Sequence, residues 1–332
     1  MPVRSEVMFV GCYTADRGDG RGIVALRVDA DGTLTPQGEP TPVVSPSFLA
    51  WHPTLPVLYA VSETEESEVT AWTVSAEGGL ARHGHAETGG ADACHVAVDP
   101  DGRFLLVTNY SGGSLAVHRL GEDGGILALS DLVPHKRHSI SQRQTSPHPH
   151  MAKFTPDGVL VVDLGGDVIY RYRVDADGRA IQSAAPVELP PGTGPRHLTR
   201  AGECWYVAGE LDASVACFDE QWRLLGKVPS TRSAEPAFPS EIAASGDFVY
   251  VANRGPDTVA VFNVEGGLPD YVAEVPTGEW PRHLAIVGDR LYVASERSHE
   301  LAMMTVDPAT GIPKAHQVLA VPSPTCVLPP KP

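Results

Sequence analysis

The chain has 332 residues, of which 42% are hydrophobic, and its formal net charge at pH 7 is −16. This length and composition allow a sizeable buried core. The acidity, together with the lack of a long Lys/Arg run, argues against nucleic acid or an anionic membrane surface as a partner. An anionic ligand would therefore need a local cluster of basic residues.

The N-terminal sequence MPVRSEVMFVGCYT lacks the basic, apolar and cleavage regions of a signal peptide. No stretch of about 18 apolar residues is present, so we expect a cytoplasmic protein. The five cysteines are scattered and lack C-x-x-C spacing, which is typical of reduced thiols rather than of disulfides or a zinc site.

In chain order, VMFVGCYT and GIVALRVDADGTL predict strands at the N-terminus, and a similar hairpin then recurs. Copies of this hairpin span Pro46–Glu63, Ala93–Tyr110, Pro149–Leu164, Gly192–Leu211, Pro239–Arg254 and Pro281–Glu296. An amphipathic run with an acid-plus-glycine turn follows several copies, as in Val69–Leu80, Leu115–Leu127 and Ile169–Ile181. Each unit thus predicts four strands.

The copies align on the first apolar residue of each inner strand: Leu49, Val96, Ala152, Leu198, Ile242, Leu284 and Val327. Intervals of 47, 56, 46, 44, 42 and 43 residues match the period of about 40–50 residues in propeller blades. The last copy has only an inner strand, which the N-terminal strands would complete. We therefore predict an all-β, seven-bladed β-propeller of four-stranded blades, forming a single domain over residues 1–332, with no exposed sheet edge.

Two polar loops, Leu132–His150 and Ser230–Glu241, precede inner strands and should lie on the same face of the ring. The first is basic and His-rich and accounts for the long 56-residue interval. It is either a neutral insertion or a lid or wall of a site.

Equivalent repeat positions predict three rings of side chains around the central channel. The first ring contains Ser47, Cys94, His150, Arg196, Ser240, Arg282 and Thr325. The second contains Phe48, His95, Met151, His197, Glu241, His283 and Cys326, and the third contains Tyr13, Glu63, Tyr110, Leu164, Glu210, Arg254 and Glu296. Because neighbouring strand residues face opposite sides, we expect the first and second rings to point in different directions.

The charge in the first and third rings exceeds what packing alone requires. The arginines of these two rings could form salt bridges with Glu63, Glu210 and Glu296 that hold neighbouring blades together. Alternatively, they could form a pocket for an anion at the channel mouth.

His150 lies in the ring with the arginines, and Glu210 lies across one hairpin from Arg196. The histidines of the second ring, including His197, have either a structural role between blades or a role in the site. His148 is expected in the loop or at the rim. Asn109 either stabilises a turn or belongs to the binding site.

The segments VGCYT, PGTGPRHL (Pro191–Leu198), GEL (Gly209–Leu211), VANRG (Val251–Gly255) and PHPH resemble the seven-bladed propeller lactonase family. This family includes bacterial 6-phosphogluconolactonases and fungal carboxy-muconate cyclases. The resemblance spans nearly the whole chain and implies a catalytic set of His150, Arg196, Glu210 and Arg254. We add as expected substrate-binding residues Arg282, Glu63, His148, His197, Asn109 and Tyr110. Cys12 replaces a common Thr, and Ser62 precedes Glu63 in place of a common Asn.

The resemblance implies hydrolysis of a sugar lactone, with 6-phosphogluconolactone as the first candidate. Arg196 and Arg254 would bind an anionic group or polarise the carbonyl, and either Glu210 or His150 would be the general base. No nucleophile elbow is present, and we expect no cofactor, no metal and a monomer. The alternatives are a muconate-type cyclase or isomerase, a non-catalytic binding propeller, and a metal-dependent gluconolactonase, which the nearby arginines disfavour.

Overall fold

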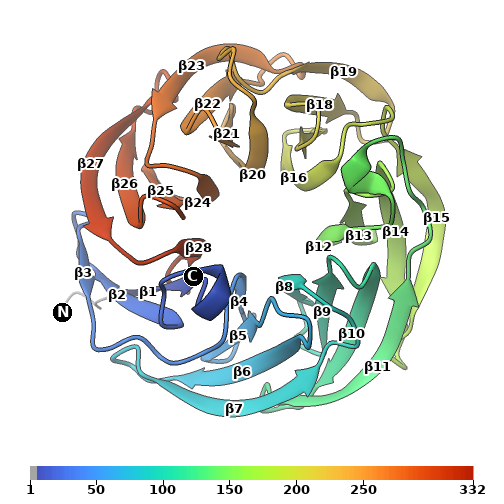
Figure 1. Cartoon of the computed structure of the whole chain (residues 1–332), viewed down its shortest axis with the longest axis vertical. Coiled ribbons are helices and arrows are strands. Elements are labelled where there is room, and N and C mark those ends of the chain that lie inside the picture. Colours follow the sequence, from blue (N-terminus) through green and yellow to red (C-terminus); the bar gives the residue numbers. More distant parts are fainter. Residues whose placement is uncertain (1–5, 332) are drawn as a thin grey trace.

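The computed structural model describes residues 6–331, and these form a ring of seven four-stranded antiparallel sheets (Figure 1). The predicted all-β seven-bladed propeller is therefore confirmed. In the described chain, the helical segments are two single 3-10 turns, η1 (Ala15–Arg17) and η2 (Gln142–Gln144). No helix there is long and apolar enough to cross a membrane.

The blades follow one another along the chain, with the inner strand first. The first three complete blades contain β4 (Leu49–Trp51), β5 (Val57–Val61), β6 (Glu68–Val74) and β7 (Leu80–Glu87); β8 (Ala93–Val98), β9 (Phe104–Asn109), β10 (Ser114–Leu120) and β11 (Ile126–Pro134); and β12 (Pro149–Thr155), β13 (Gly158–Asp163), β14 (Val168–Val174) and β15 (Ala180–Glu188). The next three contain β16 (Pro195–Ala201), β17 (Cys204–Gly209), β18 (Ser214–Phe218) and β19 (Leu224–Pro229); β20 (Phe238–Ser245), β21 (Phe248–Arg254), β22 (Thr258–Asn263) and β23 (Asp270–Pro276); and β24 (Pro281–Val287), β25 (Arg290–Ser295), β26 (Glu300–Val306) and β27 (Pro313–Ala320).

The seventh blade joins the two ends of the chain. Its order is β28 (Pro324–Leu328), β1 (Glu6–Cys12), β2 (Ile23–Val28) and β3 (Leu34–Pro36). β1 pairs with β28 through Val10 and Val327, and with β2 through Val10 and Val24. This confirms the predicted closure, in which every blade has a neighbour on both sides.

The apolar core lies between consecutive blades, where each sheet face packs on the next. Three fully buried tyrosines in second strands also cross this boundary, because each donates a hydrogen bond of 2.6–2.9 Å to a turn carbonyl of the following blade. The pairs are Tyr59 with Gly124, Tyr206 with Gly267, and Tyr250 with Gly311. These glycines have φ values of +70 to +85°, a conformation that disfavours other residues. The glycine of the acid-plus-glycine turn therefore supports packing between blades.

A β-bulge interrupts the start of six inner strands and determines which side chains reach the channel. In β12, for example, Pro149 pairs with Asp163 and Met151 pairs with Val162, which leaves His150 without a partner in the ladder. β16 skips Arg196 and His197 in the same way. Because a bulge places two or more residues of one strand opposite a single residue of the neighbouring strand, the strict alternation of side chains is lost.

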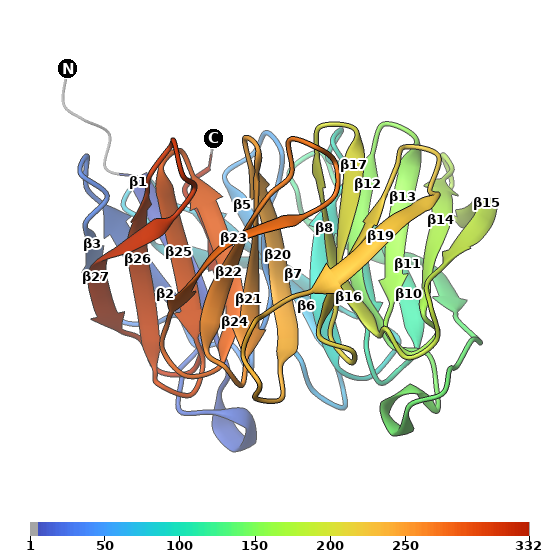
Figure 2. The ribbon, with the colours of Figure 1, turned by 90° about the horizontal axis from the view of Figure 1, so that it is seen from above.

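One face of the ring carries the longer loops. η1 and η2 both project from this face (Figure 2). The loop before β12 covers residues 135–148, because β11 extends to Pro134, so the predicted boundaries of 132–150 were too wide. The loop before β20 enters on the same face, as expected, since both loops lead into inner strands.

Candidate functional site

Residues of all three rings, mostly of the first, meet in a small pocket at the channel mouth, on the face that carries η1 and η2. Its wall is formed by Ser47, Phe48, Glu63, Cys94, His150, Arg196, His197, Arg282, His283 and Thr325. Its cavity volume is about 10 Å³, room for roughly one water molecule. A larger ligand must therefore also occupy the rim.

The expectation that the first and second rings point in different directions was wrong at several blades. Arg196 and His197 are neighbours in the sequence, yet both line the pocket, as do Arg282 and His283. The physical reason is the β-bulge, which releases these residues from the alternation of a regular strand.

Glu210 is buried at the centre of a cluster of three arginines, of which Arg196 and Arg254 are also buried. Its Oε2 is 2.9 Å from Nη2 of Arg254 and 3.2 Å from Nε of Arg196, and its Oε1 accepts a 2.6 Å hydrogen bond from Nη1 of Arg143. Burial alone would raise the pKa of Glu210, but the three arginines outweigh it and hold the pKa at about 2. Glu210 is therefore ionised at neutral pH, and its lone pairs are engaged by cations.

Arg196 is buried but lacks hydrogen-bond partners for two of its nitrogen atoms, Nε and Nη1. The 3.2 Å approach of Nε to Glu210 is an ion pair in which the N–H is not directed at the oxygen. Burial and the neighbouring Arg254 lower the pKa of Arg196 to about 10, which still leaves it charged at pH 7. An unpaired buried donor is costly, so this side of the pocket is suited to receive an oxygen atom of a ligand.

Glu63 is the centre of a second cluster on the opposite wall. Its Oε1 accepts hydrogen bonds from the Tyr13 hydroxyl at 2.8 Å and from Nη1 of Arg17 at 3.0 Å. Arg282 lies 3.8 Å from the same oxygen and 3.5 Å from Glu296, and its guanidinium lies over the Tyr13 ring at 4.7 Å. The Oε2 atom of Glu63 is buried without a partner, so it can accept a hydrogen bond from a ligand hydroxyl.

His150 is buried between these two clusters. Its Nδ1 is 3.2 Å from Nε2 of His197, and no described residue hydrogen-bonds to its Nε2. Burial, followed by the charge of Arg196, lowers the pKa of His150 well below its ordinary value. The ring is therefore neutral at pH 7 and able to accept a proton.

The other predicted site residues lie at the rim or outside the pocket. His148 stacks on Tyr110 with the ring centroids 4.3 Å apart, and the Tyr110 hydroxyl accepts a hydrogen bond from Arg143 at 3.1 Å. Asn109 is buried, and its amide donates to the carbonyl of Thr88, which follows the preceding blade, and to Ser114 of its own blade. The structure therefore places Asn109 in a bracing position rather than in the pocket wall.

Two arginines at the site were missed by the repeat alignment. Arg17 is in η1 and Arg143 is in η2, and each reaches from its loop to one of the two central glutamates. Neither occupies a repeat position, so aligning the copies could not find them. Only the extra length of the loop before β12 indicated that something near Arg143 was unusual.

The loop that carries Arg143 is anchored at several points. His135 and the His148 amide each contact the Asp163 carboxylate at 2.8 Å, and Gln144 donates to the Leu164 carbonyl at 2.8 Å. Ser141 also caps η2. This network makes the loop a fixed wall of the site in this structure.

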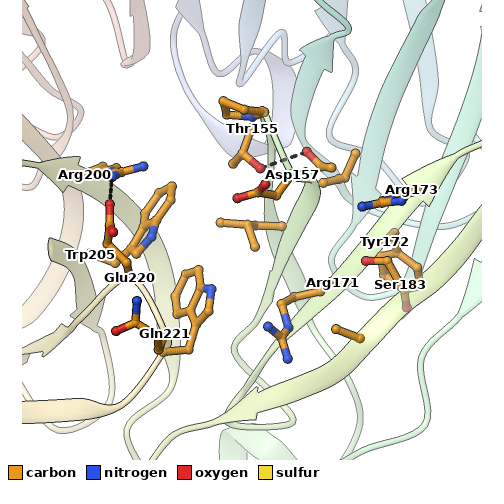
Figure 3. Close-up of a pocket in the computed structure, with 16 residues that line it drawn as sticks. Thr155, Asp157, Arg171, Tyr172, Arg173, Ser183, Arg200, Trp205, Glu220 and Gln221 are labelled. Carbon is orange, nitrogen blue, oxygen red and sulfur yellow. Dashed lines mark hydrogen bonds and ion pairs between the residues drawn. The ribbon is translucent and has the colours of Figure 1, made fainter. Parts of the chain in front are cut away.

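A much larger pocket lies elsewhere, between the blades of β12–β15 and β16–β19. Figure 3 shows its lining, which includes the end of β12, the start of β17 and the β18–β19 turn. These are the strand ends on the face away from η1 and η2, so this pocket is separate from the site at the channel mouth.

Among the described residues, no group of three or more His, Cys, Asp or Glu side chains is arranged to hold a metal ion. The two central carboxylates instead face arginines. The groups that face the pocket are a neutral imidazole, unpaired guanidinium N–H groups and carboxylate acceptors.

Comparison with known proteins gives a consistent result over the whole ring. A family model described as "Lactonase, 7-bladed beta-propeller" matches residues 7–329. A 6-phosphogluconolactonase of Bacillus subtilis is 29% identical and covers 96% of this chain and 97% of its own, and one of Formosa agariphila is 28% identical over 95% and 96%. The solved structure of a periplasmic gluconolactonase of Pseudomonas aeruginosa superposes with a TM-score of 0.91 at 28% identity, covering 98% of this chain and 99% of the other. This chain belongs to the lactonase family of seven-bladed β-propellers.

Proposed function

We propose that this protein is a metal-independent lactonase that hydrolyses 6-phosphogluconolactone at the mouth of the central channel. The observation that carries the proposal is Arg196, a buried guanidinium with unpaired N–H groups beside the neutral ring of His150. A positively charged donor next to a base is what ester hydrolysis by water requires.

In this mechanism His150 is the general base. The water oxygen forms a bond to the lactone carbonyl carbon while its proton moves to Nε2 of His150. Arg196 donates hydrogen bonds to the carbonyl oxygen as negative charge develops on it. The bond between the carbonyl carbon and the ring oxygen then breaks, and the imidazolium of His150 returns the proton to that oxygen, which yields the open hydroxy acid.

The sequence left open whether Glu210 or His150 is the general base, and in this mechanism Glu210 is not the base. A carboxylate whose pKa is about 2 is a weak base at neutral pH. Its ion pairs with Arg196 and Arg254 instead orient these guanidinium groups toward the substrate. Glu210 is therefore a positioning residue in this proposal, and His150 accepts the proton.

The rest of the wall fits a phosphorylated sugar. The free Oε2 of Glu63 and the unpartnered hydroxyl of Ser47 are buried acceptors for sugar hydroxyl groups. Arg17 and Arg143 are half-exposed cations at the rim, and arginine is well suited to bind phosphate. The names of the relatives include both a 6-phosphogluconolactonase and a gluconolactonase, so the phosphate is the feature to test.

The test is hydrolysis of 6-phosphogluconolactone and of gluconolactone by the purified protein in excess chelator, after subtraction of the spontaneous rate. We expect turnover that is insensitive to the chelator and has a higher kcat/KM for the phosphorylated lactone. Arg196→Gln should lower kcat by about 100–1000-fold, whereas Arg200→Gln, at the exposed end of the same strand, should retain activity within about twofold. Absence of turnover on both lactones would overturn the proposal, and loss of activity with the chelator would overturn its metal independence.

A further inference from the structure

Three buried side chains from three adjacent blades form one hydrogen-bonded chain that ends at the pocket. Nδ1 of His197 lies 2.8 Å from Oε2 of Glu241, and Nε2 of His197 lies 3.2 Å from Nδ1 of His150. The residues belong to β20, β16 and β12, and each is less than 10% exposed. The mechanism above uses only the last of them.

The direction of this chain follows from the groups around Glu241. Its Oε1 accepts a hydrogen bond from the Ile242 amide at 3.1 Å, and its Oε2 also lies 3.3 Å from Nε2 of His283. Nδ1 of His283 accepts from the Val327 amide at 3.3 Å, so the neutral ring of His283 carries its proton on Nε2. Glu241 therefore faces donors on both oxygens and acts as an acceptor.

With Glu241 as the acceptor, Nδ1 of His197 must carry a proton. A neutral imidazole carries only one, so Nε2 of His197 accepts and Nδ1 of His150 donates. The neutral ring of His150 then has its lone pair on Nε2, the atom to which no described residue hydrogen-bonds. The chain thus selects the tautomer that a general base in the pocket needs.

The electrostatic surroundings favour neutral histidines in this chain. Burial and then Arg196 lower the pKa of His197 as well as that of His150. Burial raises the pKa of Glu241, against the opposing effects of His283 and Arg196, which makes its carboxylate a stronger acceptor. The titratable and charged groups around the chain are the cations Arg196, Arg254, Arg282 and Lys153, the carboxylates Glu63 and Glu210, and the side chains of His95, His283, Cys94 and Tyr110.

We propose that Glu241 and His197 are positioning residues that hold His150 in its Nδ1–H tautomer, with Nε2 free to accept the proton of the attacking water. This inference rests on the proposed lactonase activity for its kinetic consequence. Its structural content, the tautomer of His150, stands independently of any substrate.

Glu241→Gln tests the kinetic consequence, because an amide –NH2 can donate to Nδ1 of His197 and so reverse the chain. His150 would then carry its proton on Nε2 and could not act as a base. We expect kcat to fall by about 100-fold or more with KM changed by less than about threefold. Glu241→Asp should recover part of the lost kcat, and Glu203→Gln, an exposed position in a neighbouring blade, should match the wild type. A wild-type kcat in folded Glu241→Gln would overturn the proposal.

Long-range ¹H–¹⁵N spectra of the histidine rings give a second readout that needs no substrate. Wild-type His150 should show a protonated Nδ1 and an unprotonated Nε2, and Glu241→Gln should show the reverse. If the wild type hydrolyses no lactone but gives the expected tautomer, the proposed function fails and the positioning network remains. A proton on Nε2 of wild-type His150 would overturn the network itself, even if Glu241→Gln does not fold.

Discussion

The pocket at the channel mouth is much smaller than the large pocket on the other face, yet it contains buried polar atoms without partners, which the described residues that line the large pocket lack. The cavity volume between β12–β15 and β16–β19 is about 440 Å³, whereas the channel mouth encloses about 10 Å³. Yet two of the three arginines that line the large pocket, Arg171 and Arg200, have acceptors within the protein. Arg171 donates to the Ala185 carbonyl at 2.8 Å, and Arg200 donates to the Gly202 carbonyl at 3.1 Å and pairs with Glu220 (Figure 3).

The aromatic groups of the large pocket are also engaged with one another. Trp205 stacks on Trp222 with the ring centroids 5.2 Å apart, and the Arg200 guanidinium lies 5.7 Å from the Trp205 ring. At the channel mouth, by contrast, Arg196 and Glu63 retain buried polar atoms without partners. The comparison teaches that unsatisfied buried polar groups, rather than volume, distinguish the candidate site from the large pocket.

The largest expected effect comes from removing the base at the channel mouth. His150→Ala should lower kcat for lactone hydrolysis by about 100–10,000-fold, because water then lacks a proton acceptor. The measurement is steady-state kinetics, with thermal unfolding to verify the fold. His138→Ala removes an exposed histidine from the adjacent loop and should have little effect. Equal activity of the two variants would contradict the assignment of the base.

The pH dependence of lactone hydrolysis should also report on the protonation of His150. Burial, Arg196 and His197 lower the pKa of His150 well below 6.5, and only the unprotonated ring can accept a proton. As the pH falls, kcat/KM should therefore stay constant down to 6.5 and decline only below it, by about tenfold per pH unit beyond the pKa. Arg196→Gln removes a nearby positive charge and should move this decline to higher pH. A wild-type decline that begins above pH 6.5 would contradict the proposal.

A smaller effect is expected at the rim. Arg143→Ala removes the hydrogen bond to Oε1 of Glu210 and a cation at the mouth. We expect KM for the phosphorylated lactone to rise by about 3–10-fold while kcat changes less, since a rim arginine binds the phosphate in the ground state and the transition state alike. Arg137→Ala, an exposed arginine of the same loop that pairs with Glu188, is the matched control. A KM unchanged for the phosphorylated lactone would remove Arg143 from the phosphate site.

The smallest effect is expected at the large pocket. Arg173 lines it and is exposed, so Arg173→Ala should leave kcat/KM within about twofold of the wild type. The same lactone assay measures it. A tenfold loss would mean that the large pocket contributes to the reaction, and the contrast between the two pockets would then have to be abandoned.

Periodicity in the sequence was sufficient to predict the ring. The regular spacing of Leu49 and its six equivalents predicted seven blades, and the incomplete last copy predicted the pairing of β28 with β1. The alignment of equivalent repeat positions also predicted that His150, Arg196 and Arg282 would meet, and all three line the pocket. Such positions are predictable because each blade repeats the same local pattern and can bury its faces only against its neighbours.

Features that break the repeat could not be predicted in this way. Arg17 and Arg143 come from irregular loops, and their contacts with Glu63 and Glu210 depend on how those loops fold back over the channel. The direction in which His197 points depends on a bulge that ordinary strand alternation does not foresee.

The sequence by itself therefore determined the architecture and the repeat positions that face the channel, because strand periodicity and blade packing are encoded locally and copied along the chain. Only the tertiary structure decided which of these side chains are satisfied and which are left open to a ligand. Glu210 is saturated by three arginines, Arg196 retains free N–H groups, and His150 is oriented through His197. These differences arise from distances of a few ångströms between residues of different blades, which no pattern within one blade contains.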